Sequence, residues 1–191
     1  MQKLKVSKKA IGEAARILIN GGVVIFPTET VYGIGGLASS ESAVKRIYEI
    51  KKRPFDKPLQ ILVSDQSQVN QFASEISSKA KALMKKYWPG PLTLIFKKKS
   101  VVSDVITSSG NTVGLRMPGN STILKLIKET GPIAASSANT SGQPDPISAE
   151  EVKIEANLLL DGGPCKMGKS STVVDASTDP PLILRQGAIK I

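Results

Sequence analysis

The 191-residue chain contains no histidine, only one cysteine and few aromatic residues. Without histidine it can form neither a Ser-His-Asp triad nor a histidine metal site, and nothing of that kind can activate Cys165 as a nucleophile. A lone cysteine cannot form an internal disulfide, which favours the cytoplasm as its compartment. One Trp, three Tyr and four Phe supply few rings for stacking on nucleic-acid bases. Any chemistry must therefore come from carboxylates, Lys, Arg, hydroxyls and backbone N–H groups.

Long apolar runs are also missing from the sequence. No run approaches the ~18 residues that would suggest a membrane span, so we expect no membrane partner. The basic residues 1–22 lack a signal-peptide core, because Gly12, Glu13 and Arg16 interrupt it. We predict instead that this segment forms an amphipathic helix.

Positive charge is abundant: 26 Lys and Arg residues stand against 16 Asp and Glu residues, for a net charge of +10 and a pI near 9.7. This balance favours an anionic partner such as nucleic acid, a nucleotide or a phosphorylated metabolite. A solvated lysine-rich surface explains the same composition equally well. Charge alone leaves both interpretations open.

The spacing of apolar and turn-forming residues predicts helices that alternate with strands. Helices are expected after Ser7, after Ser40, over 66–87, over 120–130 and, from an S-x-x-E capping box, at 148–151. Strands are expected at 23–26, 59–63, 92–96, 112–117, 132–136, 157–161, 171–175 and 182–187. This order predicts an α/β fold: a single domain over residues 1–191, with a twisted mixed β-sheet flanked by helices.

The stretch GPCKMGKS, residues 163–170, matches the G-x-x-x-x-G-K-S/T pattern of a phosphate-binding loop. That mechanism requires a helix directly after the loop, because the helix N-terminus holds the phosphate. Residues 171–175, STVVD, are mostly β-branched and predict a strand instead. The required context is missing, so we do not expect this stretch to bind phosphate in that way.

Polar segments recur where apolar strands end, at 27–36, 116–120, 136–142 and 170–171. Each has a simpler explanation on its own: turn formers dominate 136–142, and Arg116 and Arg185 could form surface ion pairs of little energetic value. Likewise, the basic residues 51–53 could merely oppose a helix dipole, although prolines stiffen the chain that follows. Asp161 and Asp175 could bind Mg²⁺ or close turns, and no spacing specifies a metal site. Together the recurring polar ends predict one shared cleft.

The combination of motifs resembles the threonylcarbamoyl-adenylate synthase (YrdC) family over nearly the whole chain, in family order. The residues that carry the resemblance are FPTETVYG (26–33), KKRP (51–54), GLRMP (114–118), PIAASSAN (132–139) with Ser141-Gly142, DGG (161–163), STVVD (171–175) and LRQG (184–187).

Membership of this family implies formation of L-threonylcarbamoyladenylate and pyrophosphate from L-threonine, bicarbonate and ATP. The product serves threonylcarbamoyladenosine modification of tRNA, which partner proteins complete. The resemblance implies a YrdC-like fold around a positively charged cavity and no additional C-terminal domain. It implies Mg²⁺, carried mainly by the ATP phosphates, and no tightly bound organic cofactor. Direct contact with tRNA or double-stranded RNA is a further expectation.

The resemblance also implies residue roles. The catalytic floor under the phosphates and the carbamate would consist of Lys51, Arg53, Ser137 and Asn139. Arg53, Lys57, Thr112, Ser137 and Arg185 would bind ATP, and Thr30, Arg116 and Ser171 would bind L-threonine. The chain departs from many relatives in having Ser136 in place of proline. Leu62 stands where some relatives have a histidine, and we assign it no role.

Three alternatives stay open at this point. The positive charge permits a double-stranded RNA or tRNA-binding module without ATP turnover. A paralogue that acts on another carbamoyl substrate would share the same cavity. The third alternative is a conventional phosphate-loop nucleotidase that uses Lys169.

Overall fold

The computed structural model describes residues 1–191 and has ten strands in a single mixed sheet. In sheet order the strands are β1 (Gln2–Lys5), β8 (Leu158–Asp161), β2 (Val24–Phe26), β3 (Gly33–Leu37), β7 (Ile133–Ser137), β4 (Gln60–Leu62), β6 (Thr112–Arg116), β5 (Leu92–Lys97), β9 (Thr172–Asp175) and β10 (Leu182–Arg185). Four neighbouring pairs are parallel (β1–β8, β2–β8, β4–β6 and β5–β9) and the other five are antiparallel. The predicted mixed α/β sheet is confirmed.

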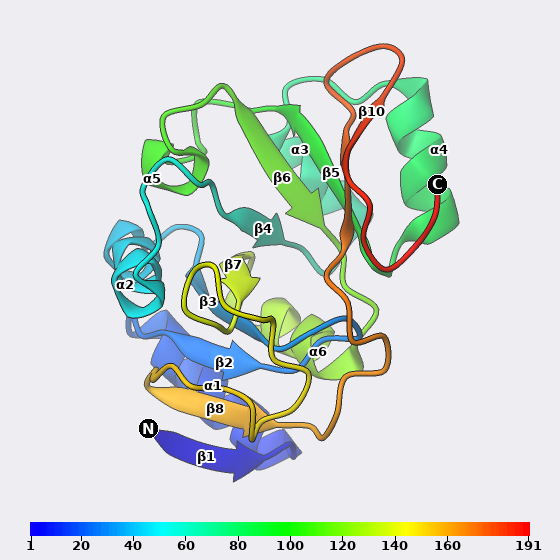
Figure 1. Ribbon diagram of the computed structural model, residues 1–191. Helices are drawn as coiled ribbons and strands as arrows, with labels where there is room; N and C mark the ends of the chain where they lie inside the picture. The colour runs from blue at the N-terminus through cyan, green and yellow to red at the C-terminus, as the bar shows by residue number, and fades with distance from the viewer.

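Helices cover both faces of this sheet (Figure 1). They are α1 (Lys8–Ile19), α2 (Glu41–Lys51), the 3₁₀ turn η1 (Gln66–Gln68), α3 (Val69–Phe72), α4 (Ser78–Tyr87), α5 (Asp104–Thr107) and α6 (Ser121–Thr130). Helices α1 and α6 pack together on one face, whereas α2 and α4 contribute to a larger apolar cluster on the other. None of these helices is both long enough and apolar enough to cross a membrane.

Strand β2 shows why a continuous apolar run forms a strand here. Val24 and Phe26 belong to the cluster with α1 and α6, while Val23 and Ile25 belong to the opposite cluster. Because side chains alternate along a strand, a sheet with both faces covered needs apolar residues at every position. The strand therefore ends in the interior, and the polar loop after it starts from a buried position.

Side-chain caps explain where the predicted helices begin. The hydroxyl of Ser7 accepts a hydrogen bond from Ala10 N–H at the start of α1, and Ser40 does the same for Ala43 at α2. The Asn120 side chain accepts from the first turn of α6. These three starts agree with the prediction from sequence.

Four local predictions were wrong. Residues 2–5 form β1 rather than the start of a helix, because β8 supplies hydrogen-bond partners for an edge strand. Residues 33–37 form β3 rather than a loop, despite three glycines, because β2 and β7 pair with it on both sides. The predicted helix over 66–87 is broken at 73–77, where Ser77 caps a new helix. At 148–151 there is only a turn, in which the Glu151 carboxylate accepts the Ile147 N–H.

Candidate active site

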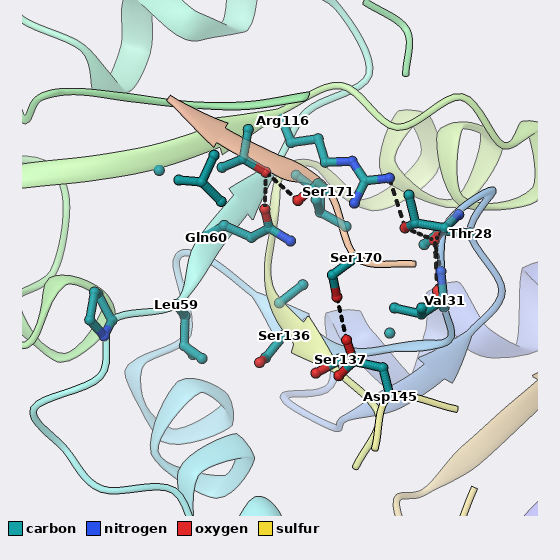
Figure 2. A pocket seen from close by; sticks show the side chains of 18 of the residues that line it. Thr28, Val31, Leu59, Gln60, Arg116, Ser136, Ser137, Asp145, Ser170 and Ser171 are labelled. Atoms are coloured by element: carbon teal, nitrogen blue, oxygen red, sulfur yellow. Dashed lines mark hydrogen bonds between the residues drawn. The ribbon is translucent and has the colours of Figure 1, made fainter. Parts of the chain in front are cut away.

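A cavity of about 270 Å³ lies over the face of strands β7, β4, β6, β5 and β9 (Figure 2). Its floor uses small residues such as Ala135 and Gly114, which leave space above the sheet. Three arginines, Arg53, Arg116 and Arg185, line it with a single carboxylate. Polar side chains from distant parts of the chain therefore meet in one concave site, as the recurring strand ends predicted.

The loop after β2 brings two threonine hydroxyls into the cavity wall. Thr30 is fully buried, and its hydroxyl lies 2.8 Å from that of Thr28. The Thr28 hydroxyl in turn donates to the Val31 carbonyl oxygen at 2.6 Å and accepts from the N–H groups of Thr30 and Val31. This network holds the loop without help from a ligand.

Arg116, at the end of β6, is almost completely buried next to that loop. Its Nη2 donates to Glu29 Oε1 at 2.7 Å and to the Thr30 hydroxyl at 3.0 Å, and its Nε donates to the Gly90 carbonyl. A guanidinium has five N–H groups, so the two on Nη1 stay free of protein partners. They suit a carboxylate, which arginine binds through paired hydrogen bonds.

Ser171 and Arg185 meet on the opposite side of the threonine loop. Arg185 donates to the Ser171 carbonyl at 2.9 Å through Nη2, which also approaches the serine hydroxyl. The Ser171 hydroxyl lies 2.9 Å from that of Thr93, which donates to Gln60 Oε1. Burial lowers the pKa of the Arg185 guanidinium, although nearby Asp145 opposes that shift.

Lys51 lies behind the cavity wall rather than in it. It is 1% exposed, and its Nζ donates to the carbonyl oxygens of Ser137 (2.5 Å) and Asn139 (2.6 Å) and to Asn139 Oδ1 (3.1 Å). These bonds use all three N–H groups of the ammonium. Burial, followed by repulsion from Arg53, lowers the pKa of Lys51 to about 8. The lysine thus holds the 137–139 loop, and Ser137, not Lys51, lines the cavity.

The segment after α2 places the other predicted ATP contacts. Lys52 ends the helix in the left-handed conformation (φ 48°), and Arg53 follows into the cavity wall. The guanidinium of Arg53 donates to the carbonyls of Lys57 and Pro58, and burial lowers its pKa. Thr112 also lines the cavity, whereas the Lys57 side chain is exposed and does not.

The structure also adds residues that the sequence interpretation left without a role. Asp145 is the only carboxylate in the lining, and it accepts a short hydrogen bond from the Ser170 hydroxyl. Glu29 is the ion-pair partner of Arg116, and its second oxygen is buried without a partner. Both lie in polar segments that were noted as strand ends, but neighbouring sequence gives no signal for their long-range partners.

Residues 163–170 form a loop that leads directly into β9, with no helix after it. Lys169 is exposed and does not line the cavity. The match to the phosphate-loop pattern is therefore coincidental, as the strand-like residues after it indicated. No group of three or more His, Cys, Asp or Glu side chains could hold a metal ion.

A protein-family model matches residues 16–187 of this chain. It covers the Sua5, YciO and YrdC proteins and carries the description "Telomere recombination". The chain belongs to this family. The resemblance drawn from its motifs is confirmed.

Known members of the Sua5/YciO/YrdC family align along almost the whole chain. The threonylcarbamoyl-AMP synthases of Pyrococcus abyssi and Bacillus subtilis are each 45% identical to it over 98% of its length. The chain spans only 56% of each of these relatives. A putative threonylcarbamoyl-AMP synthase of Methanocaldococcus jannaschii is 35% identical, and the match covers 96% of this chain and 88% of that protein.

Solved structures agree with this assignment. P. abyssi Sua5 complexed with L-threonine superposes with a TM-score of 0.92 at 45% identity, over 97% of this chain and 57% of that one. Escherichia coli YciO gives a TM-score of 0.85 at 25% identity, over 97% of this chain and 95% of that one. The twisted sheet with flanking helices is thus the fold of the family.

Proposed function

We propose that this chain is a threonylcarbamoyl-AMP synthase, which forms L-threonylcarbamoyladenylate and pyrophosphate from L-threonine, bicarbonate and ATP. One observation carries the proposal: the residues expected to bind threonine and most of those expected to bind ATP line the same cavity. The names of the relatives at 45% identity, one of them solved with L-threonine, support it.

The reaction needs positioning and charge stabilisation more than a reactive side chain. The threonine amine attacks CO₂ or activated bicarbonate to give a carbamate. A carbamate oxygen then attacks the α-phosphorus of ATP, and the bond from that phosphorus to pyrophosphate breaks. Holding such groups in line can lower a barrier by ~7–11 kcal/mol in favourable cases. Arginines around a closed cavity stabilise the charge that develops on the phosphate oxygens.

Each ligand group has a matching partner in the wall. The free N–H groups of Arg116 suit the threonine carboxylate, with Thr30 and Ser171 beside it. Arg53, Arg185 and Ser137 suit the phosphates. Lys51 and Asn139 support that end by shaping the loop that carries Ser137.

Mg²⁺ fits this site as a companion of ATP. Because no protein cluster could hold the ion alone, the ATP phosphates would carry it, and Asp145 offers the one carboxylate oxygen in the lining. Bound there, Mg²⁺ would neutralise phosphate charge. We further propose a cytoplasmic role in tRNA threonylcarbamoyladenosine modification together with partner proteins.

The decisive test is pyrophosphate release from ATP and Mg²⁺, with L-threonine or bicarbonate omitted in turn. The proposal predicts dependence on both, with serine as a poor substitute. Release that ignores threonine would instead identify a paralogue with another acceptor. No release, combined with tight RNA binding that weakens steeply with salt, would identify a nucleic-acid-binding module.

A further inference from the structure

The hydroxyl protons around Thr30 have only one consistent arrangement. The Thr28 hydroxyl donates its single proton to the Val31 carbonyl oxygen, at 2.6 Å. The 2.8 Å contact between the two threonine hydroxyls must therefore use the proton of Thr30, with Thr28 as the acceptor. Arg116 donates to Thr30 from the other side, at 3.0 Å. Thr30 thus has no proton left to offer a ligand and keeps one lone pair.

The reverse arrangement would cost a buried hydrogen bond. If Thr28 donated to Thr30, the carbonyl oxygen of Val31 would lose its donor in a residue that is only 6% exposed. An unpaired buried carbonyl is strongly unfavourable, because water cannot replace the lost donor. Figure 2 shows this chain of bonds running from Arg116 into the Thr28–Val31 loop.

Ser171 has the same polarity, on independent evidence. The Thr93 hydroxyl donates to Gln60 Oε1, so the 2.9 Å contact between Thr93 and Ser171 uses the serine proton. Arg185 approaches the Ser171 oxygen as a donor. Both hydroxyls expected to bind L-threonine therefore present acceptors, while the arginines present donors.

We propose that Thr28 is a positioning residue that directs the Thr30 proton into the protein, so that the cavity selects an amino acid whose β-substituent donates a hydrogen bond. The inference rests on the proposed function, since it assumes that the amino acid lies beside Thr30. It adds that the substrate hydroxyl is recognised as a donor, not as an acceptor, and that the residue responsible is one removed from the ligand.

Substrate analogues that accept but cannot donate test the proposal on the unmodified protein. Dissociation constants would be measured by calorimetry, with a non-hydrolysable ATP analogue present. O-methyl-L-threonine should bind about tenfold more weakly than L-threonine and no tighter than isoleucine, which has the same shape. Likewise, 2-amino-3-fluorobutanoate should bind no tighter than 2-aminobutanoate. If either acceptor-only analogue bound as tightly as L-threonine, the proposal would be overturned.

A pair of variants tests the role of Thr28 itself. Thr28→Val removes the acceptor and frees the Thr30 proton, so the preference for O-methyl-L-threonine over isoleucine should rise severalfold. Thr28→Ser keeps the hydroxyl and should restore the original selectivity, an effect that a general loss of stability cannot produce. An identical ratio in both variants would contradict the assignment. Failure of L-threonine itself to bind would reject the proposed function, which distinguishes that outcome from an error in proton direction alone.

Discussion

Replacing Lys51 by methionine is the sharpest test of how the site is built. Methionine keeps much of the length and apolar character of the side chain but removes the ammonium. The carbonyl oxygens of Ser137 and Asn139 and the Asn139 amide oxygen then lose a donor that lies within 2.5–3.1 Å of them. We expect the loop at 137–141 to loosen even without a ligand, because Lys51 lies behind it.

The magnitude follows from those three bonds. A hydrogen bond to a charged group contributes about 1.5–3 kcal/mol, but water can reach the half-buried loop and replace part of the loss. We therefore expect Lys51→Met to lower the free energy of unfolding by about 3 kcal/mol. For a chain of this size the melting temperature should fall by about 6–12 °C.

Denaturant unfolding and amide hydrogen exchange measure the two consequences separately. The Ser141 N–H donates to the Lys51 carbonyl at 2.8 Å and reports on the loop, so its exchange should become about 100-fold faster in the unliganded variant. Lys45→Met, on the exposed side of the same helix, is the matched control and should change stability by less than about 0.5 kcal/mol. Unchanged stability and exchange, with ATP affinity alone reduced, would refute the reasoning and show that Lys51 reaches the phosphates.

The pH dependence of the same pair of proteins gives a signed prediction. Lys51 has a pKa of about 8 in the folded protein, below its ordinary value of 10.5, so between these values the unfolded chain holds the proton more tightly. The unfolded state therefore loses ground as pH rises from about 8 to about 10.5. The stability difference between the wild type and Lys51→Met should grow in favour of the wild type by about 3 kcal/mol across that window. A flat difference would mean that Lys51 stays protonated throughout.

Three further substitutions probe the surroundings of the cavity. Tyr32→Phe should lower the free energy of unfolding by about 1–2 kcal/mol in denaturant titrations, because the phenol donates to one main-chain group of residues 162–163 and accepts from another. Gly187→Ala should reduce both stability and threonine affinity, since a Cβ there would overlap the main chain of residues 170–171; ordinary threonine binding by calorimetry would contradict this. Lys169→Ala should leave pyrophosphate release unchanged, whereas a large loss would revive the phosphate-loop interpretation.

Local sequence patterns were sufficient for several features of this protein. Alternating periodicities predicted the α/β class, and cap residues such as Ser7 and Ser40 marked helix starts, because both signals depend on neighbours within a few residues. The β-branched run after residue 170 ruled out a phosphate loop for the same reason. Motif order along the chain was enough to identify the family.

The tertiary structure decided features that depend on partners far along the chain. Strand β3 exists because β2 and β7 pair with it, which outweighs the weak strand preference of its glycines. Lys51 reaches a loop 86 residues away and so lies behind the cavity wall, although the sequence placed it among the groups that touch substrate. The role of Thr28 likewise depends on which neighbour takes its proton. Composition and spacing predict which groups gather at a site, but only the packed chain determines which way each donor points.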